Sequence, residues 1–123
     1  MDGDGKGDEM HKGVNEIGVD GCELIRIERK RQTEEEGWSI EHDDEQLDGN
    51  LAKAAACYAM PEDERLYGIS GIIRERLAPL HWPWESRWWS PTPNDRVREL
   101  VKAGALIAAE IDRELRFEKR NKS

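Results

Sequence analysis

The chain has 123 residues, of which 37% are hydrophobic and 37% are charged, and its formal net charge is −8. This length provides one small domain with a modest core. No apolar run reaches 18 residues and the first residues are polar, so we expect neither a membrane span nor a secretory signal. Cys22 and Cys57 form no CxxC or zinc-type spacing, and we expect them to be reduced in a cytoplasmic protein.

The negative charge is concentrated in the first part of the chain. Residues 1–48 carry 16 acidic and 6 basic side chains, whereas residues 49–123 carry 11 and 13. An acidic half argues against general nucleic-acid binding through phosphates. It permits binding of cations or of a basic protein surface, although a solvated acidic surface is the simplest interpretation. Residues 1–20 are rich in Gly and acid and predict a disordered extension, followed by a single helical domain over residues 21–120.

The first predicted helix runs from about Glu23 to Glu36 and stops at Gly37, a residue suited to a left-handed helix end. Its few apolar residues leave Glu28, Arg31 or Gln32 on the inward face. Polar groups there are costly unless they are paired or liganded.

Two further helices are predicted before residue 80. One begins near Asp48 and covers Leu51–Met60, and Cys57 is expected to be buried within it. The other lies between Pro61 and Pro79. The apolar stripe of the Leu51–Met60 helix has the spacing of a buried helix face and consists of Leu51, Ala54, Ala55 and Tyr58.

Residues 81–93 contain four tryptophans and three prolines, and we call this segment the tryptophan strap. The prolines predict an irregular backbone. The tryptophans could stack on a nucleobase, form a protein-binding hot spot, or close a core built largely of alanine, which Trp38 would join.

The last predicted helix is the clearest one. Thr92 supplies a capping hydroxyl, Pro93 the first helical position and Asp95 an acid in the first turn. No segment has the alternation of a strand, so the predicted fold is all-α, a small bundle of three to four helices with an irregular strap. The predicted buried side of the last helix comprises Val97, Leu100, Val101, Gly104, Ile107, Ile111 and Leu115.

Histidine and acidic residues mark a candidate reactive site at His42-Asp43-Asp44. Hard divalent ions such as Mg²⁺ or Mn²⁺ prefer oxygen ligands, which Asp43, Asp44 and Glu110 could provide. His42 with Asp44 could instead carry out general acid–base catalysis. A third interpretation is that Asp43 or Asp44 caps a helix through backbone amides.

Residues for a polar or nucleotide ligand are expected on the first and last helices and on the strap. Lys102 would meet a phosphate and a tryptophan would stack on the base. Alternatively, Lys102 and Glu110, two turns apart, belong to surface ion pairs. The candidate ligand-binding residues are Glu28, Gln32, Trp38, Trp84, Trp88 and Lys102.

Several motifs together resemble a family of small, mostly uncharacterised proteins of tailed phages and prophages. They are Glu36-Gly37-Trp38, Glu41-His42-Asp43-Asp44, Trp82-Pro83-Trp84 with Trp88-Trp89-Ser90-Pro91, and the run Leu100–Ile111. The resemblance covers about three quarters of the chain and implies a phage origin, hence the host cytoplasm. Asn50 departs from the family, which has Glu at this position.

A looser resemblance is to the all-α NTP pyrophosphatases, which use helical carboxylates and Mg²⁺. Here the acidic spacings Glu41-x-x-Asp44 and Glu45-x-x-Asp48 fall in a segment expected to be a loop.

Two functions are therefore carried forward. The first is binding of a nucleotide or small polar ligand, with metal-dependent hydrolysis as an extension. The second is a non-enzymatic phage accessory protein that inhibits a host or anti-phage defence protein. The small core and the tryptophans favour a homodimer.

Overall fold

A computed structural model describes residues 18–67 and 78–122. Within these ranges the chain is helical and contains no strand, which confirms the all-α prediction. Residues 1–17 of the predicted extension, and most of the helix predicted between Pro61 and Pro79, lie outside the described residues. The helices are α2 (Gly21–Glu34), α3 (Ile40–Asp44), α4 (Asn50–Ala59) and α5 (Arg96–Lys122), with 3-10 turns η1 (Glu62–Glu64) and η3 (Ser86–Trp88).

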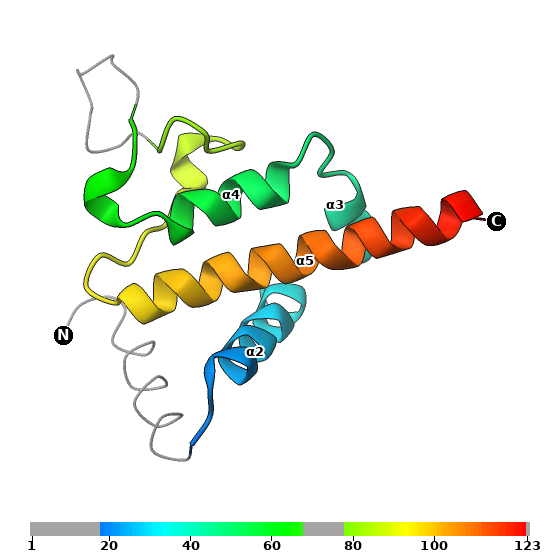
Figure 1. The fold of residues 1–123 in the computed structure, drawn as a ribbon, viewed down its shortest axis with the longest axis horizontal. Helices are drawn as coiled ribbons and strands as arrows, with labels where there is room; N and C mark the ends of the chain where they lie inside the picture. The colour runs from blue at the N-terminus through cyan, green and yellow to red at the C-terminus, as the bar shows by residue number, and fades with distance from the viewer. Residues whose placement is uncertain (1–17, 68–77, 123) are drawn as a thin grey trace.

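The long helix α5 organises the fold. Figure 1 shows α4 along one side of α5 and α2 crossing on another, with α3 against its C-terminal half. None of the helices described is both long and apolar enough to cross a bilayer. Because α2, α3 and α4 each pack mainly on α5, this helix positions the other helices relative to one another.

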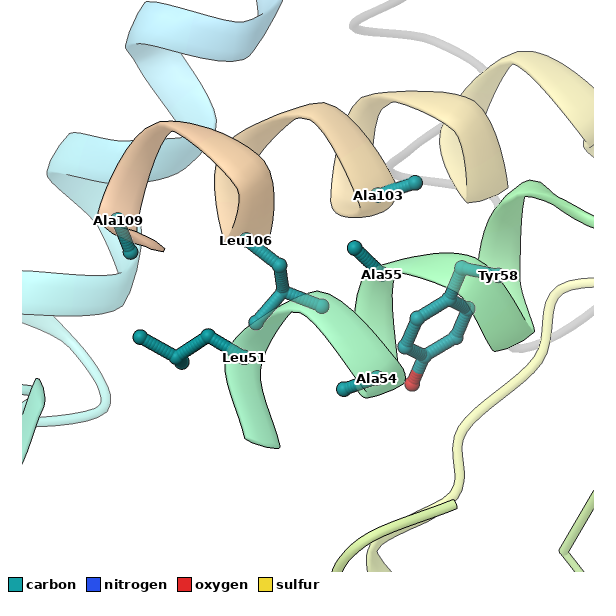
Figure 2. Close-up of a cluster of buried hydrophobic side chains, with 7 residues drawn as sticks. All are labelled: Leu51, Ala54, Ala55, Tyr58, Ala103, Leu106 and Ala109. Carbon is teal, nitrogen blue, oxygen red and sulfur yellow. The ribbon is translucent and has the colours of Figure 1, made fainter. Parts of the chain in front are cut away.

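The core lies between α4 and α5 and is built mainly from alanine. Figure 2 shows Leu51 and Leu106 meeting at its centre, with Tyr58 at one end. The predicted α4 stripe is buried as expected, and so is Cys57. Small side chains let the two helices approach closely, and four partly buried tryptophans add volume at the margin. The core cluster consists of Leu51, Ala54, Ala55, Tyr58, Ala103, Leu106 and Ala109, with Trp38, Trp82, Trp84 and Trp89 packed against it.

The predicted buried face of α5 is largely wrong. Of its seven residues only Val101 is buried, while Leu100, Ile107 and Ile111 are exposed. Two helices pack against α5 from different sides, and close packing on both favours alanine at the contacts. Hydrophobic size alone therefore identified the wrong side of the helix. The buried residues of α5 are Glu99, Val101, Ala103, Ala105, Leu106 and Ala109.

Helix ends differ in detail from the sequence prediction. Helix α2 ends at Glu34, before Gly37, although Gly37 does adopt a left-handed φ of 71°. The side chain of Asp95, rather than that of Thr92, accepts from the backbone N–H of Arg98 at the start of α5 (3.0 Å). The backbone of His42 donates to the Ser39 hydroxyl oxygen (3.0 Å). The expectation that Asp43 or Asp44 caps a helix is therefore wrong, because Ser39 has that role at α3.

The strap is irregular, as predicted, and a buried ion pair ties it to the helices. Glu99 accepts from Arg65 Nη2 at 2.9 Å and from the backbone N–H of Thr92 at 2.9 Å. Arg65 also donates to the carbonyl of Cys57 (2.9 Å), and its guanidinium lies over Trp89. One carboxylate thus connects α5, the end of α4 and the strap.

Candidate functional site

A pocket of about 1080 Å³ opens where α2, α3, α4, α5 and the strap converge. Seven of the candidate residues line it, although they come from positions up to 74 apart in the chain. These seven are Glu28, Gln32, Trp38, His42, Trp84, Trp88 and Lys102. The fold therefore assembles all the proposed ligand-binding residues and the proposed base into one cavity.

Aromatic rings form one wall of the pocket. Trp38 stacks on His42, with ring centroids 5.2 Å apart and planes at 23°. Trp84 meets Trp38 edge-on at 6.4 Å and Trp82 edge-on at 5.3 Å. Its indole N–H donates to Gln46 Oε1 at 2.8 Å, which fixes the ring. A preformed wall of this kind offers apolar faces to a planar ligand without a further ordering cost.

Glu28 lies at the base of the pocket and is held by arginines. Its carboxylate is 2% exposed and accepts from Arg98 Nη1 at 2.6 Å and from Arg31 Nη2 at 2.7 Å. Burial raises the pKa of Glu28, but the hydrogen bonds and charges of Arg31 and Arg98 outweigh that effect and lower it overall. Glu28 is thus an anion already neutralised by protein groups, and it orients the two arginines.

The side-chain amide of Gln32 has a described hydrogen-bond partner for its nitrogen but not for its oxygen. The side chain is on the pocket lining, and the residue is 3% exposed. Its Nε2 donates to Glu28 Oε2 at 3.4 Å, while no described group donates to its buried Oε1. A buried acceptor without a donor costs free energy, so this oxygen favours a ligand that brings an N–H or O–H group.

Lys102 closes the side of the pocket next to the strap. Its ammonium donates to the carbonyl of Ser90 at 2.7 Å and lies 5.4 Å from the centroid of the Tyr58 ring. The Tyr58 hydroxyl accepts from the backbone N–H of Ser90 (3.2 Å), and burial raises the pKa of Tyr58 to about 12. The neutral phenol and the ammonium together hold the strap against α5.

His42 and Asp43 form a dyad at the rim. His42 Nδ1 lies 3.0 Å from Asp43 Oδ1, and Asp43 is 2% exposed with Arg29 Nη2 at 3.6 Å from its other oxygen. A carboxylate at Nδ1 favours the tautomer that leaves Nε2 as an acceptor. This is the arrangement in which a histidine can take a proton from a bound group.

The residues proposed for metal binding are not brought together. Asp44 accepts from Arg116 Nη2 at 2.8 Å, and this hydrogen bond lowers the pKa of Asp44. Glu110 accepts from Arg113 Nε at 2.9 Å, which lowers the pKa of Glu110 in the same way. Neither of these carboxylates lines the pocket. Within residues 18–67 and 78–122, no three His, Cys, Asp or Glu side chains are grouped so that they could hold a metal ion.

Sequence reasoning missed several pocket residues. Arg98 precedes Lys102 by four residues on α5, so helical spacing alone places both on one side and could have identified it. Gln46 and Tyr58 also line the cavity, but nothing in the sequence connects them with it. The alternative that Lys102 and Glu110 belong to ion pairs holds for Glu110, which is paired with Arg113, whereas Lys102 donates to the Ser90 carbonyl.

Comparison of the chain with known protein families, with curated proteins and with solved structures finds no match. Function must therefore be argued from the pocket.

Proposed function

We propose that the pocket binds a small nucleotide through its base and its phosphate. The observation that carries this proposal is the unpaired acceptor of Gln32 in a cavity walled by Trp38, Trp84 and His42. A nucleobase matches both features, because it is planar and aromatic and carries N–H donors on its edge. A base with an N–H donor on its edge, such as adenine with its amino group, is favoured over an analogue such as purine, whose nucleotide carries no N–H donor on the base.

The charge of the lining limits the phosphate content of the ligand. Three basic side chains are countered by three carboxylates, so the lining has no net positive charge. These six residues are Arg31, Arg98, Lys102, Glu28, Glu36 and Glu85. A site that binds a polyphosphate usually has more basic than acidic side chains. This lining has equal numbers of both, so a nucleoside monophosphate is the best fit. A di- or triphosphate would need Mg²⁺ or Mn²⁺ carried on its own oxygens, because Asp44 and Glu110 are bound by arginines.

Hydrolysis is the extension of this proposal. His42 is the histidine of the pocket lining and has Asp43 as its carboxylate partner, so it would act as the general base on an attacking water. Asp44, proposed with it from the sequence, faces Arg116 and Arg120 and takes no part in the proposed chemistry.

The test combines tryptophan fluorescence and thermal melting with nucleoside mono- and triphosphates, with and without Mg²⁺ or Mn²⁺. Four of the five tryptophans line the pocket, so a stacked base should quench their emission. A ligand that binds only the folded state should also raise the melting temperature. Phosphate release in the same mixtures reports hydrolysis, which His42→Ala should abolish. Absence of quenching and of any melting shift across the panel would refute the proposal.

Matched variants assign the effect to the pocket. Gln32→Leu removes the acceptor at nearly constant volume, and we expect it to weaken an amino-bearing base by about tenfold, the value of one hydrogen bond. It should leave the binding of purine riboside monophosphate, whose base carries no N–H donor, little changed. Thr33→Val alters the neighbouring exposed position of α2 and should bind like the wild type. If Gln32→Leu binds both nucleotides with the same affinity as the wild type does, Gln32 takes no part in recognition of the base.

A second candidate function rests on Trp88. This side chain lines the pocket rim, yet it is 59% exposed and lies under the guanidinium of Arg87 at 5.0 Å. An exposed tryptophan of this kind is a typical protein-binding hot spot, which suits an accessory protein that inhibits a host or defence protein. Binding to such a partner should be lost in Trp88→Ala and kept in Leu47→Ala, an exposed control that belongs neither to the strap nor to the pocket lining. Loss of binding in both variants would argue against Trp88 as the contact.

A further inference from the structure

Arg98 reaches the pocket lining from the first turn of α5 and keeps hydrogen-bond donors unused. Its Nη1 donates to Glu28 Oε1 at 2.6 Å. Its Nε and Nη2 donate to no group in the part of the chain that the structure describes, and neither nitrogen is fully buried. Because the side chain lines the pocket and is 21% exposed, these two donors can reach a bound ligand.

The two unused nitrogens lie on one edge of the planar guanidinium. Nε and Nη2 of an arginine present parallel N–H groups, a geometry that fits two oxygens of one phosphate or carboxylate. Arg31 uses this edge on Glu28, with its Nε at 2.9 Å from Oε1 and its Nη2 at 2.7 Å from Oε2. Within the described residues the same edge of Arg98 has no partner, so it can receive an oxyanion.

Glu28 holds the guanidinium of Arg98 in place before a ligand binds. The Glu28 carboxylate is 2% exposed, and the hydrogen bond to its Oε1 fixes the far end of the arginine side chain. A long, flexible side chain usually loses rotamer freedom when it binds a ligand, and this costs free energy. Much of that cost is already met in Arg98, which favours its use as a binding group.

The same carboxylate connects Arg98 with the site proposed for the base. Gln32 Nε2 lies 3.4 Å from Glu28 Oε2, whereas Arg98 Nη1 lies 2.6 Å from Glu28 Oε1. The amide and the guanidinium are therefore separated by one carboxylate, close enough for a single nucleotide to reach both. Lys102 follows Arg98 by one helical turn on the same lining. Its ammonium donates to the Ser90 carbonyl, and its positive charge favours an anion nearby.

We propose that Arg98 forms an anion-binding subsite of the pocket, in which its Nε and Nη2 hold two oxygens of a phosphate monoester. This inference rests on the proposed function, and it narrows the ligand class to nucleotides that end in a phosphate, in preference to nucleosides. Hydrogen bonds to a charged group are stronger than those between neutral groups. The phosphate should therefore raise the affinity by about 10–100-fold over that of the nucleoside.

The test compares adenosine with adenosine 5′-monophosphate (AMP), each titrated into the full chain and followed by tryptophan fluorescence. The wild type should bind AMP more tightly by the factor given above. Arg98→Gln should bind adenosine as the wild type does and lose the preference for AMP, since Glu28 keeps Arg31 as its partner in this variant. Arg98→Lys retains the charge without the paired N–H groups and should show a reduced preference.

The matched control is Arg113→Gln. It removes one positive charge from α5 at a residue that is not on the pocket lining, and it should keep the wild-type preference for AMP. Loss of the preference in this control as well would show a general effect of charge and overturn the subsite.

The remaining outcomes separate this inference from the proposed function. If the wild type binds neither compound, the proposed function fails and the subsite fails with it. If the wild type binds both compounds equally, or if Arg98→Gln still prefers AMP as the wild type does, binding of the base stands and the Arg98 subsite is overturned. If far-UV circular dichroism shows that Arg98→Gln is unfolded, Arg98→Lys decides, and an undiminished preference for AMP in that variant would overturn the paired contact.

Discussion

Replacement of Glu99 by Gln tests the buried ion pair that ties the strap to the helices. The side chains of Glu99 and Arg65 are 2% and 1% exposed, so water cannot take over when the negative charge is removed. Breaking a buried pair from one side typically costs about 3–5 kcal/mol, because the remaining charge is left uncompensated. The glutamine amide also presents N–H donors where Thr92 N–H and Arg96 already donate. We therefore expect Glu99→Gln to lower the free energy of unfolding by about 3 kcal/mol or more.

The assay is urea unfolding followed by far-UV circular dichroism, with thermal melting beside it. A loss of about 3 kcal/mol corresponds to at least about 10 °C in melting temperature for a domain of this size. The matched control is Glu110→Gln, which breaks an i, i+3 pair with Arg113 that is more accessible to water, and it should cost about 1 kcal/mol or less.

A double variant separates lost charge from lost packing. Glu99→Leu with Arg65→Met removes both charges and keeps apolar volume, so it should recover most of the stability lost in Glu99→Gln. If Glu99→Gln costs no more than Glu110→Gln, the carboxylate does not hold the strap. If the double variant is less stable than Glu99→Gln, the hydrogen bonds to the strap matter more than the unpaired charge.

Three further predictions concern single residues. The pKa of the Glu28 carboxyl is lower in the folded protein than in the unfolded chain. The ionised carboxylate therefore stabilises the fold fully above the unfolded pKa of about 4.3, and this stabilisation is lost as the pH falls through the folded pKa. The melting temperature should therefore decline less below about pH 4.3 in Glu28→Gln than in the wild type; parallel pH profiles would contradict this. Burial raises the pKa of Cys57, whereas Cys22 is exposed, so a thiol reagent should modify Cys22 in the native protein and Cys57 only on unfolding; fast modification of both would refute the packing. A Cβ on Gly104 would collide with Ile25, so Gly104→Ala should destabilise the wild type by about 1–3 kcal/mol in urea unfolding. In the Ile25→Ala variant that space is empty, and the same substitution should stabilise the protein because alanine favours a helix more than glycine does. Destabilisation in both backgrounds would exclude that collision.

Much of the helical architecture was predictable because it depends on local properties. The α4 stripe of Leu51, Ala54, Ala55 and Tyr58 has helical spacing, and no other element competes with it. The irregular strap follows from prolines, which restrict the backbone wherever they occur. The buried polar face of α2 was also foreseen, since Glu28 and Gln32 had to be inward if its few apolar residues were.

The candidate site was predictable in its residue types but not in its pairings. The aromatic, amide and basic residues proposed for ligand binding line one pocket. The acids were assigned to a metal because an unpaired carboxylate cluster would need a cation. Arginines more than 70 residues away supply that positive charge for Asp44, and no local pattern indicates such a contact.

The sequence by itself determined that α2, α4 and α5 are helical, that polar residues of α2 turn inward, and that tryptophans complete a core built largely of alanine. It did not predict the short helix α3, which lies in a segment expected to be a loop. Only the tertiary structure decided which side of α5 is buried. Two helices pack on its alanines, so five large residues remain exposed, namely Val97, Leu100, Ile107, Ile111 and Leu115. The physical reason is that helix propensity and periodicity are local, whereas burial depends on how many neighbours share a helix and how closely they approach.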